Sequence, residues 1–110
     1  MSNTPASEYL LVLSTCPDSS TASVIATALL EERLAACVTR LPGVTSQYRW
    51  KGRVEQEEEI LLLIKTTAAS YSQVEDAINR LHPYELPEIV GVPLSAGSKD
   101  YLDWIRQSIQ

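Results

Sequence analysis

The sequence predicts a single α+β domain built as a two-layer sandwich, with strands and helices in the order βαββαβ and one helix added after the last strand. Short apolar runs of strand length alternate along the chain with stretches whose apolar residues recur at helical spacing. Between the second and third strands, residues 44–66 are expected to form a long hairpin that turns at Lys51 and Gly52. A chain of 110 residues, 45% of them hydrophobic, suits one domain with a modest core.

Each element follows from the local pattern of apolar, polar and turn-forming residues. The small polar residues 1–8 are expected to be a flexible N-terminus, so that the single domain spans 9–110. The expected strands lie at 9–13, at 35–50 with an interruption at Pro42 and Gly43, at 53–66 and at 88–92. The expected helices lie at 22–33, 70–82 and 101–109. A bulge is the simplest explanation of the interruption in the second strand.

Capping side chains predict where the three helices begin. A side-chain oxygen at this position accepts a hydrogen bond from an N–H group that the first helical turn leaves without a partner. The candidates are Ser19, Ser20 or Thr21 for the first helix, Ser72 with Glu75 as a capping box for the second, and Asp100 for the third.

Two turn lengths are compatible with the hairpin. A two-residue loop at Lys51 and Gly52 places Val44 opposite Glu59, so that an apolar side chain faces a charged one. A slip of one residue moves every side chain of a strand to the other face, so only one register can match the core. We expect a three-residue loop, which places Val44 opposite Ile60, Tyr48 opposite Gln56 and Trp50 opposite Val54.

The hairpin is longer than the helix expected to cover it. A strand over 53–66 spans roughly 45 Å, whereas a helix over 70–82 spans only about 20 Å. The uncovered tip carries Tyr48 and Trp50, and a long edge strand with exposed aromatic side chains invites pairing with another chain. We therefore expect a neighbouring subunit to cover the hairpin.

This order of elements is the ferredoxin-like plan, in which the chain reverses direction at each element. The reversals bring to one end of the domain Cys16, the hairpin tip, His82, Tyr84, Glu85 and Glu88, and they leave Cys37 at the other end. A disulfide requires two α-carbons within about 7 Å of each other. We therefore expect Cys16 and Cys37 to be free thiols.

Composition limits the classes of partner. The formal net charge of -5 argues against nucleic acid as a partner, because nucleic acid binds basic surfaces. No apolar run approaches the roughly 20 residues that cross a bilayer, and the N-terminus lacks a basic segment followed by an apolar one. We therefore expect a cytoplasmic protein with no membrane partner.

Cys16 and His82 are the candidate metal ligands at the shared end of the domain. His82 is the single histidine, which excludes sites that need two histidines in one subunit, and a thiolate with an imidazole suits copper or zinc. Each residue also has a structural interpretation, since a histidine ending a helix can cap it and a buried cysteine packs as a small apolar side chain. A third alternative treats the pair as nucleophile and base, which requires contact and an orienting group.

Four segments resemble the CutA family of divalent-cation tolerance proteins. They are LAACVTRLPGVTSQYRWKG at 34–52, EEILLLIKT at 58–66, HPYELPEIVGVPL at 82–94 and DYLDWI at 100–105. The resemblance implies a ferredoxin-like subunit in a homotrimer, with a long hairpin that reaches across neighbours. It also implies a role in tolerance to copper and other divalent metals, kinship of shape with PII signalling proteins, and no established catalytic reaction.

The resemblance also points to site residues. Of the three copper ligands proposed for the family, only His82 matches; Ser14 and Leu81 stand at the other two positions, and Cys16 lies two residues after Ser14. Glu59 adjoins the apolar run of the third strand and can pair with a cation, either Lys65 or a residue of a second subunit. The residues that match the family pattern for a pocket between subunits are Tyr48, Trp50, Lys65, His82 and Tyr84, to which we add Glu59.

Two function hypotheses result. The first is a cytoplasmic, non-enzymatic trimer that binds copper, another divalent metal ion or a small ligand at its subunit clefts, without an organic cofactor, and supports metal tolerance. The second is a PII-like regulator that binds a small molecule and reports it to a protein partner. An enzyme that uses Cys16 with His82 ranks third.

Overall fold

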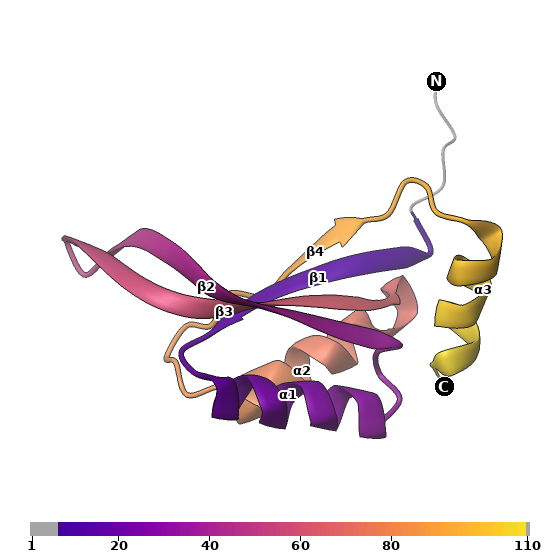
Figure 1. Cartoon of the computed structure of the whole chain (residues 1–110), viewed down its shortest axis with the longest axis horizontal. Coiled ribbons are helices and arrows are strands. Elements are labelled where there is room, and N and C mark those ends of the chain that lie inside the picture. The colour runs from indigo at the N-terminus through magenta and orange to yellow at the C-terminus, as the bar shows by residue number, and fades with distance from the viewer. Residues whose placement is uncertain (1–6, 110) are drawn as a thin grey trace.

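Four antiparallel strands form a single sheet in the computed structural model, which describes residues 7–109. The sheet has the order β2-β3-β1-β4, with β1 (Tyr9–Cys16), β2 (Cys37–Trp50), β3 (Arg53–Thr67) and β4 (Val90–Pro93). Helices α1 (Ser19–Glu31) and α2 (Tyr71–Leu81) lie side by side under one face, and α3 (Lys99–Ser108) packs at one end of the sheet (Figure 1). The α+β class and the order of elements expected from the sequence are confirmed.

The core lies between the sheet and the two helices beneath it. Side chains alternate across a strand, so every second residue of β1 and β3 points toward the helices. Burying one such aliphatic side chain stabilises the fold by roughly 1.5–3 kcal/mol. The fully buried aliphatic residues of this layer are Val12, Leu62, Ile64, Ile25, Leu29, Val74 and Ile78.

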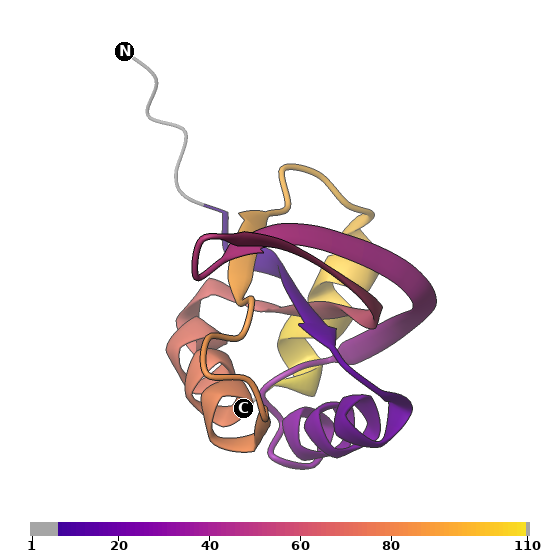
Figure 2. The ribbon, with the colours of Figure 1, turned by 90° about the vertical axis from the view of Figure 1, so that its left-hand side faces the viewer.

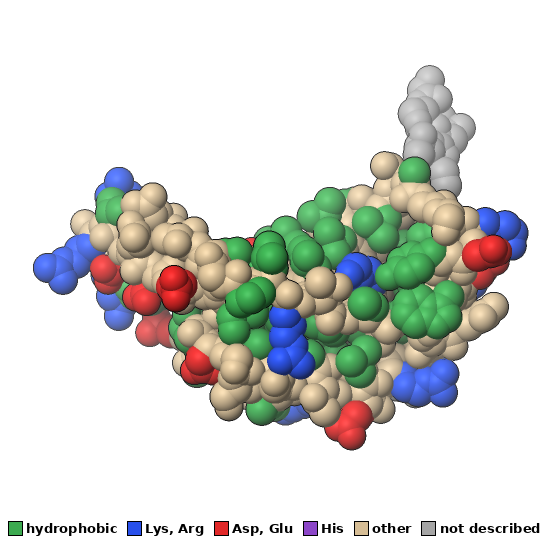
Figure 3. Space-filling view, viewed as in Figure 1, with side chains coloured by type: hydrophobic (Ala, Val, Ile, Leu, Met, Phe, Trp, Pro, Cys, Tyr) green, Lys and Arg blue, Asp and Glu red, His purple; other side chains and the backbone are tan. Residues whose placement is uncertain are grey.

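The opposite face of the sheet, here called the open sheet face, has neither α1 nor α2 above it. It carries the alternate residues of the same strands, which the register places in rows: Leu13 beside Leu63 and Val90, and Leu61 beside Leu41. Leu41 is 49% exposed and Val90 47% exposed. Hydrophobic side chains gather over the body of the molecule and are few on the projecting hairpin (Figure 3). A contiguous apolar surface of this kind is typical of a protein interface.

The hairpin of β2 and β3 projects beyond the helices, as its length predicts (Figure 1). Strand β1 pairs with residues 60–67 of β3, so residues 53–59 have β2 alone as a neighbour. Val54 is 64% exposed and Tyr48 40% exposed. The outer half of the hairpin therefore has no core of its own within the subunit.

The expected hairpin register is wrong. Trp50 pairs with Arg53, Tyr48 with Glu55 and Val44 with Glu59, because the loop has two residues. Lys51 and Gly52 have φ of 51° and 79°, the paired positive values of a turn whose twist matches that of the strands. Apolar matching has little influence here because these pairs lie outside the core.

The expected bulge at Pro42 and Gly43 explains how the core register is still met. Leu41 pairs with Leu61 and Val44 with Glu59, so two residues of β2 oppose Ile60 alone. Gly43 adopts a φ of 75°, which suits a residue without a side chain. The bulge absorbs the one-residue offset that the turn introduces.

All three expected helix caps are wrong. Asp18 caps α1 by accepting a 2.8 Å hydrogen bond from the Thr21 amide, and Ser98 caps α3 through the Tyr101 amide at 3.2 Å. Helix α2 follows a 3₁₀ turn at Ala68–Ser70 with no side-chain cap, so that Ser72 lies inside the helix. Helices α1 and α3 begin earlier than expected, at Ser19 and Lys99. Within the described residues, no helix combines the length and apolar character needed to cross a membrane.

Strand ends also differ from the expected ranges. Strand β1 continues to Cys16 and β4 begins at Val90, because both strands follow the neighbour they pair with rather than their own composition. Residues 1–6 of the expected flexible N-terminus lie outside the described residues. Ser7 is fastened by a 2.7 Å hydrogen bond to the Leu94 carbonyl, and Glu8 pairs with Arg106 at 3.2 Å.

The turn geometry predicts opposite effects of two substitutions. Gly52→Ala is expected to lower the free energy of opening at the Trp50–Arg53 pair by about 1 kcal/mol, because alanine resists positive φ. No atom lies within 4 Å of a Cβ at this position, so the effect is purely conformational. Lys51→Asn is expected to raise the same free energy by a few tenths of a kcal/mol. Native-state hydrogen exchange measures both changes; equal protection in the two variants would contradict the assignment.

Candidate functional site

A groove of about 1090 Å³ separates the hairpin from the segment that joins α2 to β4. Seen from the hairpin end, the hairpin crosses in front of β4 (Figure 2). Side chains of the hairpin form one wall, residues 83–90 form the other, and Thr15 of β1 adds the end of the sheet. The lining residues are Thr15, Thr45, Ser46, Gln47, Tyr48, Arg49, Trp50, Glu59, Pro83, Tyr84, Glu85, Leu86, Pro87, Glu88, Ile89 and Val90.

The hairpin supplies the aromatic and acidic side chains of the first wall. Tyr48 and Trp50 share one face of β2, and the register places Glu59 of β3 on the same face, opposite Val44. Trp50 is partly buried, and the Lys51 ammonium lies 5.6 Å from its ring centroid. The local hairpin geometry therefore brings three of the predicted pocket residues to one surface.

Glu59 and Tyr84 join the two walls. The Tyr84 hydroxyl donates a 2.8 Å hydrogen bond to Oε2 of Glu59, whose residue is only 4% exposed. Burial raises the pKa of Tyr84 well above its usual range, and the adjacent Glu59 carboxylate raises it further. Tyr84 therefore keeps its proton and acts as the donor to a buried carboxylate.

His82 fastens the second wall to the sheet. Its Nδ1 accepts a 3.1 Å hydrogen bond from the Tyr84 amide, and its Nε2 lies 2.7 Å from the Thr15 carbonyl. An amide can only donate and a carbonyl can only accept, so the imidazole is neutral with its proton on Nε2. The ring also packs on Tyr84 at a centroid distance of 4.6 Å. Both nitrogens thus serve the fold, in keeping with the structural interpretation of this residue.

Cys16 lies at the end of β1 and has no exposed surface. Burial raises the pKa of its thiol from 9.0 to about 11, with further contributions from the negative charges of Glu59 and Asp18. The thiol therefore stays protonated at neutral pH, whereas the thiolate is the form that attacks or binds a metal.

The donor set within one subunit does not fit a tightly held metal ion. Among residues 7–109, no group of three or more His, Cys, Asp and Glu side chains is placed to hold one. His82 would have to give up a backbone hydrogen bond, and Cys16 would have to lose a proton in a buried position.

Lys65 lies at the other end of β3 from the groove. Its ammonium donates a 2.7 Å hydrogen bond to the Thr39 hydroxyl and lies 3.9 Å from Sγ of Cys37. Cys37 marks the end of the sheet opposite to Cys16, and both cysteines are free thiols. Within one subunit, the fold therefore brings Tyr48, Trp50, Glu59 and Tyr84 together and leaves Lys65 apart.

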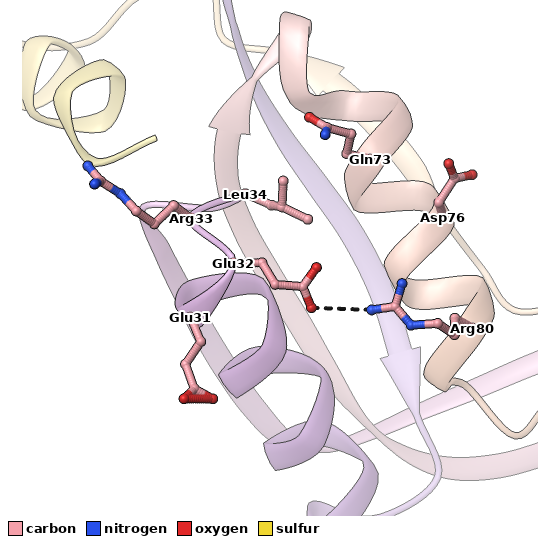
Figure 4. Close-up of a pocket in the computed structure, with 7 residues that line it drawn as sticks. All are labelled: Glu31, Glu32, Arg33, Leu34, Gln73, Asp76 and Arg80. Atoms are coloured by element: carbon pink, nitrogen blue, oxygen red, sulfur yellow. Dashed lines mark hydrogen bonds and ion pairs between the residues drawn. The ribbon is translucent and has the colours of Figure 1, made fainter. Parts of the chain in front are cut away.

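A second, smaller hollow of about 500 Å³ lies between the end of α1 and helix α2. The carboxylate of Glu32 faces the guanidinium of Arg80 across it at 3.2 Å (Figure 4). Both side chains are about half exposed, and exposed ion pairs contribute little to stability. None of the residues predicted for a site lies there.

Glu85 and Glu88 form the acidic rim of the groove; the topology predicts them at this end of the domain, but they are not among the site residues predicted from the sequence. The turn residues of the 83–90 segment predict a loop, and the topology predicts the end of the domain at which it lies but not that it packs beside the hairpin. The bond between His82 and the Thr15 carbonyl, which places that loop beside the hairpin, joins residues 67 positions apart. No local signal predicts such a contact.

The fold that carries the groove occurs in known proteins. The sequence model of the family described as CutA1 divalent ion tolerance protein matches residues 10–108. The chain belongs to the CutA1 family. The resemblance inferred from the sequence is therefore confirmed.

Relatives within the CutA1 family are similar over nearly their whole length. The divalent-cation tolerance protein CutA of Thermus thermophilus is 49% identical over 98 residues, which cover 89% of this chain and 95% of the relative. The protein of the same name from Salmonella newport is 43% identical over 103 residues, which cover 94% of this chain and 90% of the relative. The crystal structure of CutA from Xylella fastidiosa is 48% identical, with a TM-score of 0.92 over 94% of this chain and 100% of its own.

Removing the hydroxyl of Tyr84 tests its bond to Glu59. Tyr84→Phe leaves a buried carboxylate without its donor, and we expect a loss of about 1–3 kcal/mol in the free energy of unfolding. Tyr48→Phe is the matched control, because Tyr48 is 40% exposed, and its effect should stay within about 0.5 kcal/mol. Urea unfolding at fixed protein concentration measures both; equal effects would contradict this role of Tyr84.

The raised pKa of Cys16 predicts both its reactivity and a pH dependence of stability. In a Cys37→Ser variant, a thiol reagent at pH 8 should leave Cys16 unlabelled in the native protein and label it fully in denaturant. Between pH 9 and 11 the unfolded chain loses this proton while the folded chain keeps it. The folded state then binds more protons, so stability should fall as pH rises through this window.

The control for this prediction is Cys16→Ala in the same background, which should weaken the fall in stability between pH 9 and 11. An unchanged slope would assign the fall to other groups. Rapid labelling of native Cys16 would contradict its buried, protonated state.

Proposed function

We propose that this CutA1 family member acts in the cytoplasm as a homotrimer of ferredoxin-like subunits and supports tolerance to divalent cations. In this proposal each subunit cleft contains the groove, which binds a divalent metal ion or a small cationic ligand. The names of the relatives supply the role in tolerance, and the free thiols of Cys16 and Cys37 suit a reducing compartment.

The charge of the groove carries the cation proposal. Three carboxylates line it, those of Glu59, Glu85 and Glu88, against the single guanidinium of Arg49. Aromatic rings stand beside these carboxylates, and oxygen ligands together with aromatic faces attract cations rather than anions. The groove therefore raises the local concentration of cations near the subunit surface.

Exposed apolar surface supports the trimer. Leu41, Val90 and Val92 on the open sheet face are 43–49% exposed, because neither α1 nor α2 covers them. In the outer half of the hairpin, β2 and β3 likewise pair only with each other. Burial of both surfaces against further copies of the chain removes apolar area from water, which is the main driving force of association.

Coordination by His82 and Cys16 stays a prediction with a defined structural requirement. A metal ion at His82 has to replace either the Tyr84 amide or the Thr15 carbonyl as the partner of the imidazole. A metal ion at Cys16 has to displace a proton that burial retains. The acidic rim makes no such demand, because both of its carboxylates are exposed.

The two other hypotheses receive less support. Neither the family model nor the relatives named above support a PII-like regulator. The family is named for tolerance and not for a reaction. The thiol of Cys16 is protonated, and both nitrogens of the His82 imidazole are engaged in hydrogen bonds. The pair therefore lacks the nucleophile and the base that such an enzyme would need.

Calorimetric titration with copper and zinc tests the groove as the cation site. We expect the Glu85→Gln/Glu88→Gln variant to bind roughly tenfold more weakly than the native protein, because the rim loses two charges. The matched control, Glu57→Gln/Glu58→Gln, removes the same charge from the hairpin outside the lining of the groove and should bind within about twofold of the native protein.

Three results would count against this proposal. Absence of binding to the native protein would reject metal as the ligand, and equal weakening in both variants would reduce the effect to net charge. Binding that His82→Ala abolishes while the rim variant retains it would move the ion to the His82 and Cys16 position.

A further inference from the structure

Strand β3 presents a carboxylate and an ammonium at the two ends of the open sheet face. Glu59, Leu61, Leu63 and Lys65 are alternate residues of one strand, so their side chains share that face. Glu59 is buried, and the two leucines and Lys65 are partly buried. The strand thus carries opposite charges at the ends of a short apolar row.

Glu59 has no cation partner among residues 7–109. Its hydrogen bond comes from the neutral hydroxyl of Tyr84, and none of the ion pairs of the subunit includes it. Removing a carboxylate from water carries a penalty of several kcal/mol unless a cation compensates it. A residue only 4% exposed therefore needs a positive charge that the single subunit does not supply.

Lys65, in turn, lacks an anionic partner among residues 7–109. Its ammonium has the Thr39 hydroxyl and the Cys37 sulfur as partners, and no carboxylate of residues 7–109 forms an ion pair with it. An ammonium has three donors on a flexible stem, and the Thr39 hydroxyl and the Cys37 sulfur accept from two of them. The ammonium is free to meet a carboxylate beyond its own subunit.

The two charges cannot meet within one chain. They lie six positions apart on an extended strand, which separates their α-carbons by roughly 20 Å. Both nevertheless lie on the face that neither α1 nor α2 covers, with α3 packed beside the Lys65 end through the contact of Tyr101 with Cys37. A second copy packed on that face can bring the two together.

We propose that Lys65 of a neighbouring copy pairs with Glu59 and completes the groove at the subunit cleft. The inference rests on the homotrimer of the proposed function and names the contact that builds its cleft. In a closed ring every subunit donates one lysine and receives one, so all buried carboxylates are compensated at once. Glu85 and Glu88 then remain the carboxylates open to a cationic ligand.

A double-mutant cycle tests this pair. Glu59→Gln keeps an acceptor for Tyr84, and Lys65→Met keeps the length of the side chain without its charge. Each single variant should raise the subunit dissociation constant at least about tenfold in sedimentation equilibrium, because each leaves one buried charge unpaired. The double variant should raise it no further than the weaker-binding single variant.

Non-additivity is the decisive readout, because residues roughly 20 Å apart in one chain are expected to act independently. Glu58→Gln, an exposed neighbour on the opposite face of β3, is the charge-matched control for Glu59→Gln and should act additively with Lys65→Met. Additive effects of Glu59→Gln and Lys65→Met would overturn the pair and leave the trimer intact.

Zero-length carbodiimide coupling of the native protein keeps the inference testable if a variant fails to fold. Mixed light and heavy isotope-labelled chains should give a Glu59–Lys65 peptide that joins the two labels. A cross-link confined to single chains, or none, would overturn the pair. A native protein that is monomeric at micromolar concentration would overturn both the pair and the proposed trimer, whereas a coupled dimer would overturn the trimer alone.

Discussion

One constraint organises this molecule: helices α1 and α2 cover only one face of a four-stranded sheet. Strict alternation along β3 then assigns each residue to one of two environments, so Leu62 and Ile64 enter the core while Leu61 and Leu63 face outward. The buried layer supplies the stability of the subunit. The outward layer is apolar, and neither α1 nor α2 covers it.

The candidate site depends on that same division. The hairpin extends the open sheet face past the end of the core, and the bonds of His82 to the backbone draw the 83–90 segment back beside it. The groove thus depends on a hydrogen bond between residues distant in sequence and not on a local sequence motif. A histidine in this position explains the single hydrogen bond from Tyr84 to Glu59 as well, because the same turn that orients the imidazole orients the phenol.

The chain belongs to a metal-tolerance family, but its candidate ligands do not form a metal centre within residues 7–109 of one chain. The chain belongs to the CutA1 family over residues 10–108, yet its one histidine is fully engaged and Cys16 is protonated. Within the described residues, the chain carries charges without an opposite charge beside them, namely the carboxylates along the groove and the ammonium of Lys65 at the far end of β3. Charge of this kind is resolved by assembly or by a cation, and both outcomes are consistent with the proposed role.

Local pattern determined the order of the elements, the long hairpin, the bulge at Pro42 and Gly43, and the end of the domain that holds His82 and Cys16. Period and turn chemistry act over a few residues, so the sequence alone carries that information. The course of the 83–90 segment was decided by tertiary structure, whereas the hairpin register and the caps at Asp18 and Ser98 follow from local turn and cap geometry that the sequence predictions misjudged. For the 83–90 segment the deciding contact joins partners distant in sequence, because the Thr15 carbonyl replaces solvent as the partner of the His82 imidazole; for the hairpin, the conformation of a two-residue turn outweighed apolar matching across the strands.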